Sequence, residues 1–237
     1  MTDHIAKAFD VDLQDLNRMV AEMGGLAEKE IADAVQALTR RDADLARKLI
    51  AADAQIDALQ REIEERAVLT IARRQPMAVD LREVVSALRV SNEIERIGDL
   101  AKNIGKRVLD LNGDYPSLKL IRGVDHMGSL VLDQLKRVLD AYAARDVEAA
   151  LEVWKRDEEI DAMCVSLFRE LLTYMMEDPR NITFCIHLLF SAKNIERMGD
   201  HATNIAETVH YMIKGEPLIS ERPKADTTSF APLAARG

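Results

Sequence analysis

The chain has 237 residues, of which 48% are apolar but only 4% aromatic, and its formal net charge is −9. An acidic protein lacks the clustered lysines and arginines that bind phosphate backbones, so the composition argues against nucleic-acid binding. Alanine, leucine, isoleucine, glutamate, arginine and aspartate dominate, which is typical of a helical protein.

Six long helices are predicted from the apolar periodicity and from the residues that begin and end helices. Asp42 and Asp146 precede apolar periodic runs and are typical N-cap residues. Pro76 and Pro179 are each expected at the first position of a helix. A turn cluster at 112–116 ends the third helix and separates the two halves of the chain. The predicted helices cover residues 11–40, 43–74, 76–111, 117–143, 147–177 and 179–214.

The predicted fold class is all-α, with two tandem, pseudo-symmetric three-helix bundles. Each helix has about 30 residues, or about 45 Å, and short links between such helices make neighbours antiparallel. Residues 1–113 form the first bundle and residues 114–214 the second. Residues 215–237 carry prolines and alternating charges without periodicity, so we expect a flexible tail.

A duplication supports this division. Residues 94–99 (IERIGD) recur 101 residues later as 195–200 (IERMGD). Residues 53–57 (DAQID) recur 104 residues later as 157–161 (DEEID). The chain is therefore one unit of roughly 105 residues used twice, here named the first copy and the second copy.

Each copy carries two pairs of acids spaced four residues apart. Four residues are about one helical turn, so each pair shares a helix face. Glu95 also shares a heptad position with Leu81 and Leu88, which places an acid on an apolar stripe. An ionised carboxylate there costs several kcal/mol unless a cation compensates it, and either basic residues or metal ions could do so. The candidate metal ligands are Asp53, Asp57, Glu95 and Asp99 in the first copy, and Asp157, Asp161, Glu196 and Asp200 in the second.

An all-oxygen ligand set indicates hard cations. Such ligands suit Mg²⁺, Mn²⁺, Ca²⁺ or Fe, and carboxylates can bridge several ions. The expected cofactors are therefore divalent or trivalent metal ions in multinuclear clusters, with Fe, Mn, Mg and Zn as candidates. Gly98 and Gly199, inside helices, indicate close helix approach or room for an ion. Four residues are candidates to support the ligands through hydrogen bonds or ion pairs: Asn103, Asn204, Arg96 and Arg197. His201 is not duplicated and stands outside this set.

The chain closely resembles the PhoU family of bacterial phosphate-transport regulators over residues 4–215. The matching segments are 23–25 (MGG), 48–57, 74–76 (RQP), 173–178 (TYMMED) and the two hexapeptides. The resemblance implies two three-helix bundles whose E/D-x-x-x-D motifs hold multinuclear metal clusters at the acids named above.

The resemblance also implies a function. It predicts a metal-binding negative regulator of the phosphate-starvation (Pho) response. Its expected partners are the ATPase of the phosphate ABC transporter (PstB-like) and a sensor histidine kinase (PhoR-like). The membrane would be reached only through these partners, nucleic acid would not be bound, and we expect a homodimer.

Other sequence features are consistent with a cytoplasmic, non-enzymatic protein. No signal peptide or apolar run of membrane-spanning length is found. Cys164 and Cys185 are expected to be buried thiols in a reducing compartment. No Gly-rich phosphate loop or G-x-S-x-G motif occurs. Two alternatives stay open: a di-metal carboxylate enzyme in a helical bundle, and a metal-free helical adaptor.

Overall fold

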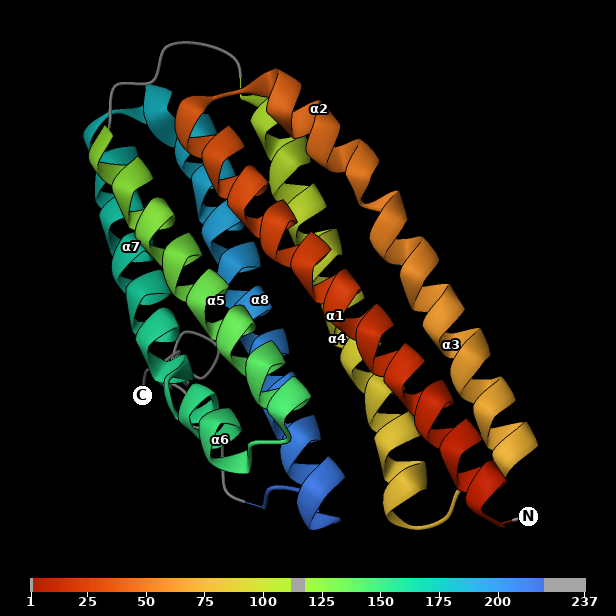
Figure 1. Cartoon of the computed structure of the whole chain (residues 1–237). Coiled ribbons are helices and arrows are strands. Elements are labelled where there is room, and N and C mark those ends of the chain that lie inside the picture. The colour runs from red at the N-terminus through yellow and green to blue at the C-terminus, as the bar shows by residue number, and fades with distance from the viewer. Residues whose placement is uncertain (1, 112–117, 220–237) are drawn as a thin grey trace, which may run out of the picture.

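The computed structural model describes residues 2–111 and 118–219, and all regular structure within these ranges is helical. This confirms the predicted all-α fold (Figure 1). The helices are α1 (Thr2–Arg40), α2 (Ala43–Ala52), α3 (Ala54–Arg74), α4 (Val79–Asp110), α5 (Leu118–Ala144), α6 (Val147–Lys155), α7 (Asp157–Glu177) and α8 (Ile182–Lys214), with a 3-10 turn η1 (Pro179–Asn181) before α8. The turn cluster at 112–116 and the tail beyond 219 lie outside the described residues.

All six predicted helices are present, but two of them are each divided into two shorter helices by a single residue. Asp53 separates α2 from α3 but keeps helical backbone angles, with φ −50° and ψ −30°. Arg156 separates α6 from α7 with φ −84° and ψ −3°. Figure 1 shows α2 and α3 following one another in nearly the same direction. The breaks are therefore local, and each lies at or beside a predicted metal ligand.

The predicted helix starts are confirmed at three positions and wrong at one. The Asp42 side chain accepts a hydrogen bond from the backbone N–H of Leu45, and Asp146 does the same for Ala149. Pro179 occupies the first turn of η1 as predicted. Pro76 instead precedes α4, because the chain passes through Ala78 at φ 50° before the helix begins. A residue with positive φ cannot continue a helix, so the proline sits in the connection.

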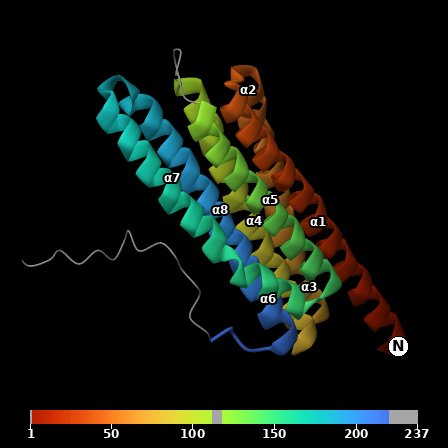
Figure 2. The same cartoon turned by 90° about the vertical axis from the view of Figure 1, so that its left-hand side faces the viewer.

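The helices form an inner layer flanked by two outer pairs. α1, α4, α5 and α8 make the inner layer, with α4 against α8 and α1 against α5. α2 and α3 pack on α1 and α4, while α6 and α7 pack on α5 and α8. Figure 1 places these outer pairs at opposite edges of the molecule, and Figure 2 shows the long helices side by side from another direction. Each copy thus contributes half of the inner layer and one outer pair.

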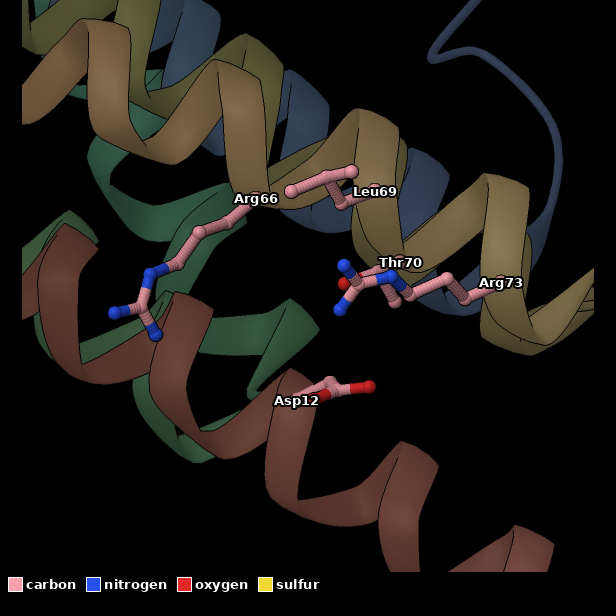
Figure 3. A pocket seen from close by; sticks show the side chains of 5 residues that line it. All are labelled: Asp12, Arg66, Leu69, Thr70 and Arg73. Atoms are coloured by element: carbon pink, nitrogen blue, oxygen red, sulfur yellow. The ribbon is translucent and has the colours of Figure 1, made fainter.

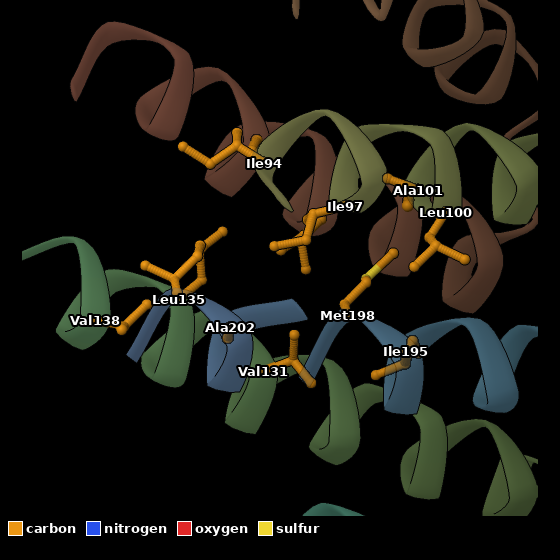
Figure 4. Close-up of a cluster of buried hydrophobic side chains, with 14 of the residues drawn as sticks. Ile94, Ile97, Leu100, Ala101, Val131, Leu135, Val138, Ile195, Met198 and Ala202 are labelled. Atoms are coloured by element: carbon orange, nitrogen blue, oxygen red, sulfur yellow. The ribbon is translucent and has the colours of Figure 1, made fainter. Parts of the chain in front are cut away.

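The inner layer is held by apolar residues that belong to the duplicated peptides. Ile97 and Met198, at matching positions of the two hexapeptides, are fully buried. The cluster in Figure 4 unites residues of three helices: Ile94, Ile97, Leu100 and Ala101 on α4, Val131, Leu135 and Val138 on α5, and Ile195, Met198 and Ala202 on α8. Since this face of each hexapeptide packs in the inner layer, the acids of the same peptide point toward the outer helices.

Two glycines mark the close approach of α1 and α5. A β-carbon at Gly24 would lie 2.6 Å from Leu139 Cδ1, and one at Gly128 would lie 2.5 Å from Val35 Cγ2. Gly24 and Gly128 are 104 residues apart, as are Val35 and Leu139. The two contacts therefore involve equivalent positions of the two copies, so the duplication is also present in the packing of α1 against α5.

We expect Gly128→Ala to lower the free energy of unfolding by about 1–3 kcal/mol, because the stiff Val35 side chain must move. Gly25→Ala is the matched control, since its added β-carbon would meet nothing within 4 Å apart from the adjoining backbone of its own helix and its chain neighbours. The free energy of unfolding of the Gly25→Ala variant should rise by up to about 1 kcal/mol, because alanine has a higher helix propensity than glycine. Urea unfolding of both variants checks the pair. Equal stability of the two would contradict the tight α1–α5 contact.

Two expectations from composition concern the cysteines and the membrane. Cys164 and Cys185 form no disulfide. Cys185 is buried as predicted, whereas Cys164, which was also expected to be buried, is only partly buried against the core. Within residues 2–111 and 118–219, no helix combines the length and apolar character that crossing a bilayer requires.

Candidate metal centre

The four predicted ligands of the first copy meet where the α2–α3 junction lies against α4; they are here named the first acid cluster. Asp53 is the junction residue and is only 4% exposed, and Asp57 lies in the first turn of α3. Glu95 and Asp99 lie one turn apart on α4 and are partly buried. Burial raises the pKa of Glu95 above its ordinary value, and the charges of Asp99, Asp57 and Asp53 raise it further. The backbone therefore brings these acids into electrostatic contact.

The second acid cluster comprises the four ligands predicted in the second copy. Asp157 begins α7, Asp161 lies one turn later, and Glu196 and Asp200 lie one turn apart on α8. Asp157, Asp161 and Glu196 are 2%, 3% and 6% exposed, so this cluster is more deeply buried than the first. Burial raises the pKa of Glu196, and a hydrogen bond from Lys193 partly offsets the increase. The charges of Asp200 and Asp161 raise it further.

Glycine allows the carboxylates to approach α4 and α8. A β-carbon at Gly98 would lie 3.3 Å from both Asp53 Oδ1 and Glu30 Oε2. A β-carbon at Gly199 would lie 3.6 Å from Asp157 Oδ1. Both glycines therefore line an acid cluster, and any larger residue would fill space beside the carboxylate oxygens. This accounts for two glycines inside helices, where each costs about 1 kcal/mol relative to alanine.

This arrangement, with two copies of one acid-bearing helix unit, matches a known family. The PhoU domain family model covers residues 20–108 and 124–209, which is one match in each copy. The chain belongs to the PhoU family. Two curated relatives carry the name phosphate-specific transport system accessory protein PhoU homolog. The Rhizobium meliloti (strain 1021) protein is 57% identical, with 95% of each chain covered. The Caulobacter vibrioides (strain NA1000 / CB15N) protein is 53% identical, with 97% of this chain and 100% of the relative covered.

Solved PhoU structures share the fold. The crystal structure of PhoU from Pseudomonas aeruginosa superposes with a TM-score of 0.83 at 40% identity, covering 88% of this chain and 100% of that one. The phosphate transport system regulatory protein PhoU from Streptococcus pneumoniae gives a TM-score of 0.82 at 28% identity, covering 89% and 99%. The arrangement of helices around the acid clusters is thus a property of the PhoU fold.

Each acid cluster of this PhoU-family chain also contains a buried residue that the sequence analysis missed. Glu30 on α1 is 4% exposed, and its Oε2 has no hydrogen-bond partner. Gln134 on α5 is 3% exposed, and its Oε1 likewise has none. Burial and then the charge of Asp53 raise the pKa of Glu30 to about 8. Glu30 and Gln134 are 104 residues apart, so the repeat offset was a signal that could have found them.

Lysines supply positive charge to both clusters. Lys102, one turn after Asp99 on α4, donates hydrogen bonds to carboxylate oxygens of Asp53 and Asp99. Burial alone would lower the pKa of Lys102, but these two hydrogen bonds raise it above its ordinary value. In the second cluster, Lys193 Nζ lies 2.8 Å from Glu196 Oε1. The sequence left open whether basic residues or metal ions compensate the acids. Basic residues are present in both clusters.

The oxygen atoms of the clusters suit a hard cation, although their present positions do not enclose one. In the described ranges, no three Asp, Glu, His or Cys side chains are placed to hold a single metal ion as they stand. Buried oxygens of Glu30 and Glu196 nevertheless have no hydrogen-bond partner. Such atoms are costly to bury, and a cation in the cluster would compensate them.

The residues considered as supports of the ligands have different surroundings. Arg96 and Arg197 are exposed, and Arg96 Nε lies 3.8 Å from Glu95 Oε2. Asn103 is also exposed. Asn204 is partly buried but donates its hydrogen bond to Glu93. Within the described residues, Arg96 forms an ion pair with the neighbouring ligand Glu95, and none of the four donates a hydrogen bond to a predicted ligand.

Glu93 instead links the two copies at the α4–α8 contact. Its Oε2 accepts a hydrogen bond from Asn204 Nδ2 at 3.0 Å and lies 2.7 Å from His201 Nδ1. Burial raises the pKa of Glu93, but the hydrogen bonds from His201 and Asn204 outweigh it and leave the pKa below its ordinary value. His201 thus faces this inter-copy contact.

A surface pocket of about 220 Å³ lies between α1 and α3 (Figure 3). It is lined by Asp12, Arg66, Leu69, Thr70 and Arg73, none of which is a predicted ligand. The carboxylate of Asp12 already accepts a hydrogen bond from Arg74 at 2.8 Å. Arg66 is paired with a neighbouring aspartate at 3.2 Å. These ion pairs join α1 to α3. The charged side chains that line the pocket therefore already serve the packing of these two helices.

Proposed function

We propose that this chain is a non-enzymatic, metal-binding regulator of phosphate uptake and of the phosphate-starvation response. Membership of the PhoU family supports the phosphate role, since curated relatives covering 95% or more of the chain are phosphate-specific transport accessory proteins. The observation that carries the metal role is the pair of buried acid clusters, each at the same place in its copy. In this proposal the protein acts in the cytoplasm as a homodimer.

The metal ions would be held between an outer helix pair and an inner helix. In the first copy the ligands are Asp53, Asp57, Glu95 and Asp99; in the second they are Asp157, Asp161, Glu196 and Asp200. Mn, Mg, Fe and Zn are the candidate metals, because carboxylate oxygens dominate the donor set. A bound ion neutralises the acids and ties the α2–α3 or α6–α7 junction to α4 or α8. Its role is therefore to fix the position of helices.

The regulation operates through protein contact. The proposed partners are the ATPase of the phosphate ABC transporter (PstB-like) and a sensor histidine kinase (PhoR-like), which the protein restrains when phosphate is plentiful. A net charge of −9 favours such protein partners over DNA. Rigid helix surfaces, positioned by the metal clusters, would form the contacts.

Deleting the gene should leave a phosphate-starvation promoter active even in high phosphate. The test is a reporter fusion measured in high and low phosphate in the native host. Re-expression of the wild-type chain should restore repression, and the Gly25→Ala chain, altered at an open surface position, should restore it equally. Immunoblots confirm equal amounts of each protein. A reporter that stays repressed in the deletion strain would contradict the regulatory role.

A further inference from the structure

We propose that another surface pocket, formed by α4, α8 and the segment that follows α8, binds an acidic side chain of a protein partner, with the Arg89 guanidinium as its anchor. This inference rests on the proposed regulation by protein contact. It names the surface that makes the contact and the chemistry of its occupant, a stretch of polypeptide with an aspartate or glutamate beside an apolar residue.

The pocket has a volume of about 430 Å³ and lies where the two copies meet. α4 contributes Arg89 and Glu93, α8 contributes Glu207 and Tyr211, and the segment after α8 contributes Leu218. Ligand-binding pockets commonly have volumes of about 300–1,000 Å³, so this one can receive one or two side chains of a partner. Because α4 belongs to the first copy and α8 to the second, an occupant touches both copies.

The Arg89 side chain is oriented by an aromatic ring and has no acidic partner. Its guanidinium carbon lies 4.8 Å from the centre of the Tyr211 ring, across the α4–α8 contact. Arg74 and Arg145, which also join separate helices, lie 2.8 Å and 2.7 Å from carboxylate oxygens. Among the described residues Arg89 forms no such ion pair, although acids outnumber lysines and arginines by 41 to 32. An arginine stacked on a ring keeps the edge of its planar guanidinium free to bind a carboxylate through two hydrogen bonds.

The two carboxylates that line the pocket are engaged elsewhere. Glu93 Oε2 lies 2.7 Å from His201 Nδ1. Glu207 Oε1 accepts a hydrogen bond from Trp154 Nε1 at 3.1 Å. Glu93 follows Arg89 by one helical turn, a spacing that permits an ion pair, but its carboxylate contacts α8 instead. The Arg89 guanidinium is therefore available for an acid that comes from another molecule.

A further donor and an apolar wall favour a polypeptide as the occupant. Asn92 Oδ1, at the edge of the pocket, accepts a hydrogen bond from Gln60 Nε2 at 2.9 Å. Among the described residues this leaves the Asn92 amide nitrogen to donate to a carboxylate or a backbone carbonyl. Leu218 is partly buried against the core, and the adjacent Ile219 is 88% exposed. A small inorganic anion would leave this apolar wall unused, whereas a peptide with an acid and an apolar neighbour covers both.

The experiment measures how tightly the two proposed partners bind variants of the full chain. The purified transporter ATPase and the purified cytoplasmic region of the kinase are each titrated onto immobilised protein by biolayer interferometry. Arg89→Gln removes the positive charge, and Arg89→Glu reverses it. Arg122→Gln and Arg122→Glu are the matched controls, because Arg122 is an exposed arginine on α5, which does not line the pocket.

We expect Arg89→Gln to weaken the binding of at least one partner about tenfold or more, and Arg89→Glu to weaken it further because like charges repel. Both Arg122 variants should bind within about twofold of wild type. Circular dichroism identifies any variant that does not fold, and the other Arg89 variant then decides.

Three results would contradict these expectations. Wild-type affinity of the folded Arg89 variants for both partners would overturn the inference while leaving regulation by protein contact intact. Equal weakening by Arg89→Gln and Arg89→Glu would show that the occupant carries no acid, which also overturns it. Failure of the wild-type chain to bind either partner would instead contradict the proposed function, and the inference with it.

Discussion

In metal-free protein, we expect Glu30→Gln to raise the free energy of unfolding by about 2–4 kcal/mol above pH 8 and to change it little near pH 4.5. Burial and the charge of Asp53 raise the pKa of Glu30 to about 8 from an ordinary value of 4.5. The folded protein therefore keeps a proton that the unfolded chain has already released. The wild-type free energy of unfolding falls as the pH rises through this window, because the unfolded state is increasingly favoured. Glutamine cannot ionise, and Gln134 already occupies the matching place in the second copy.

Urea unfolding in the presence of chelator, at about pH 5 and about pH 9, measures this effect. Glu22→Gln is the control on the same helix, since the Glu22 side chain is 56% exposed. The stability difference between wild type and Glu30→Gln should grow with pH, whereas the Glu22 variant should show little growth. A constant difference at both pH values, or the same growth in the control, would show that Glu30 does not carry the buried proton.

Removing metal from both sites should lower the thermal midpoint by roughly 15–30 °C while leaving the protein helical at room temperature. A ligand at about 1,000 times its Kd stabilises the folded state by about 4 kcal/mol per site, and each kcal/mol moves the midpoint of a chain of this size by about 2–4 °C. The buried cluster shared by α4, α5 and α8 is built from apolar side chains, and Lys102 remains to neutralise the first acid cluster. Helices should therefore persist without the ions.

Circular dichroism melts with chelator and with added Mn²⁺ test this expectation. The far-UV spectrum should match in the two conditions before heating. Loss of helix at 25 °C on chelation would mean that the apolar core does not suffice. An unchanged midpoint would mean that no stabilising ion had been removed.

Much of the fold followed from local features of the sequence. Apolar periodicity gave the long helices, and Asp42 and Asp146 cap helices as predicted, because a side-chain oxygen at that position satisfies an N–H of the first turn. The divisions at Asp53 and Arg156 carry no such signal. Both residues keep helical backbone angles, and neither break contains glycine or proline. They arise where the outer helices pack against α4 and α8, which is a tertiary effect.

The acids that recur in both copies could be predicted from the sequence. The contacts that depend on how separate helices pack could not. The acid pairs recur at a fixed offset, so repetition set them apart from ordinary solvated acids. Glu30 lies on α1, and the packing of α1 against α2, α3 and α4 brings it to Asp53. Lys102 follows Asp99 by three residues, but its contact with Asp53 depends on where the α2–α3 junction sits. Sequence spacing alone does not encode that distance.

Metal content is the most direct test of the claim that the duplicated acids bind metal. Elemental analysis compares wild-type protein, Glu95→Ala/Asp99→Ala and Glu196→Ala/Asp200→Ala, each purified without chelator and then equilibrated with saturating Mn²⁺. Each double variant should lose about half of the wild-type metal, because each removes one of two sites. Wild-type metal content in both folded double variants would contradict the account.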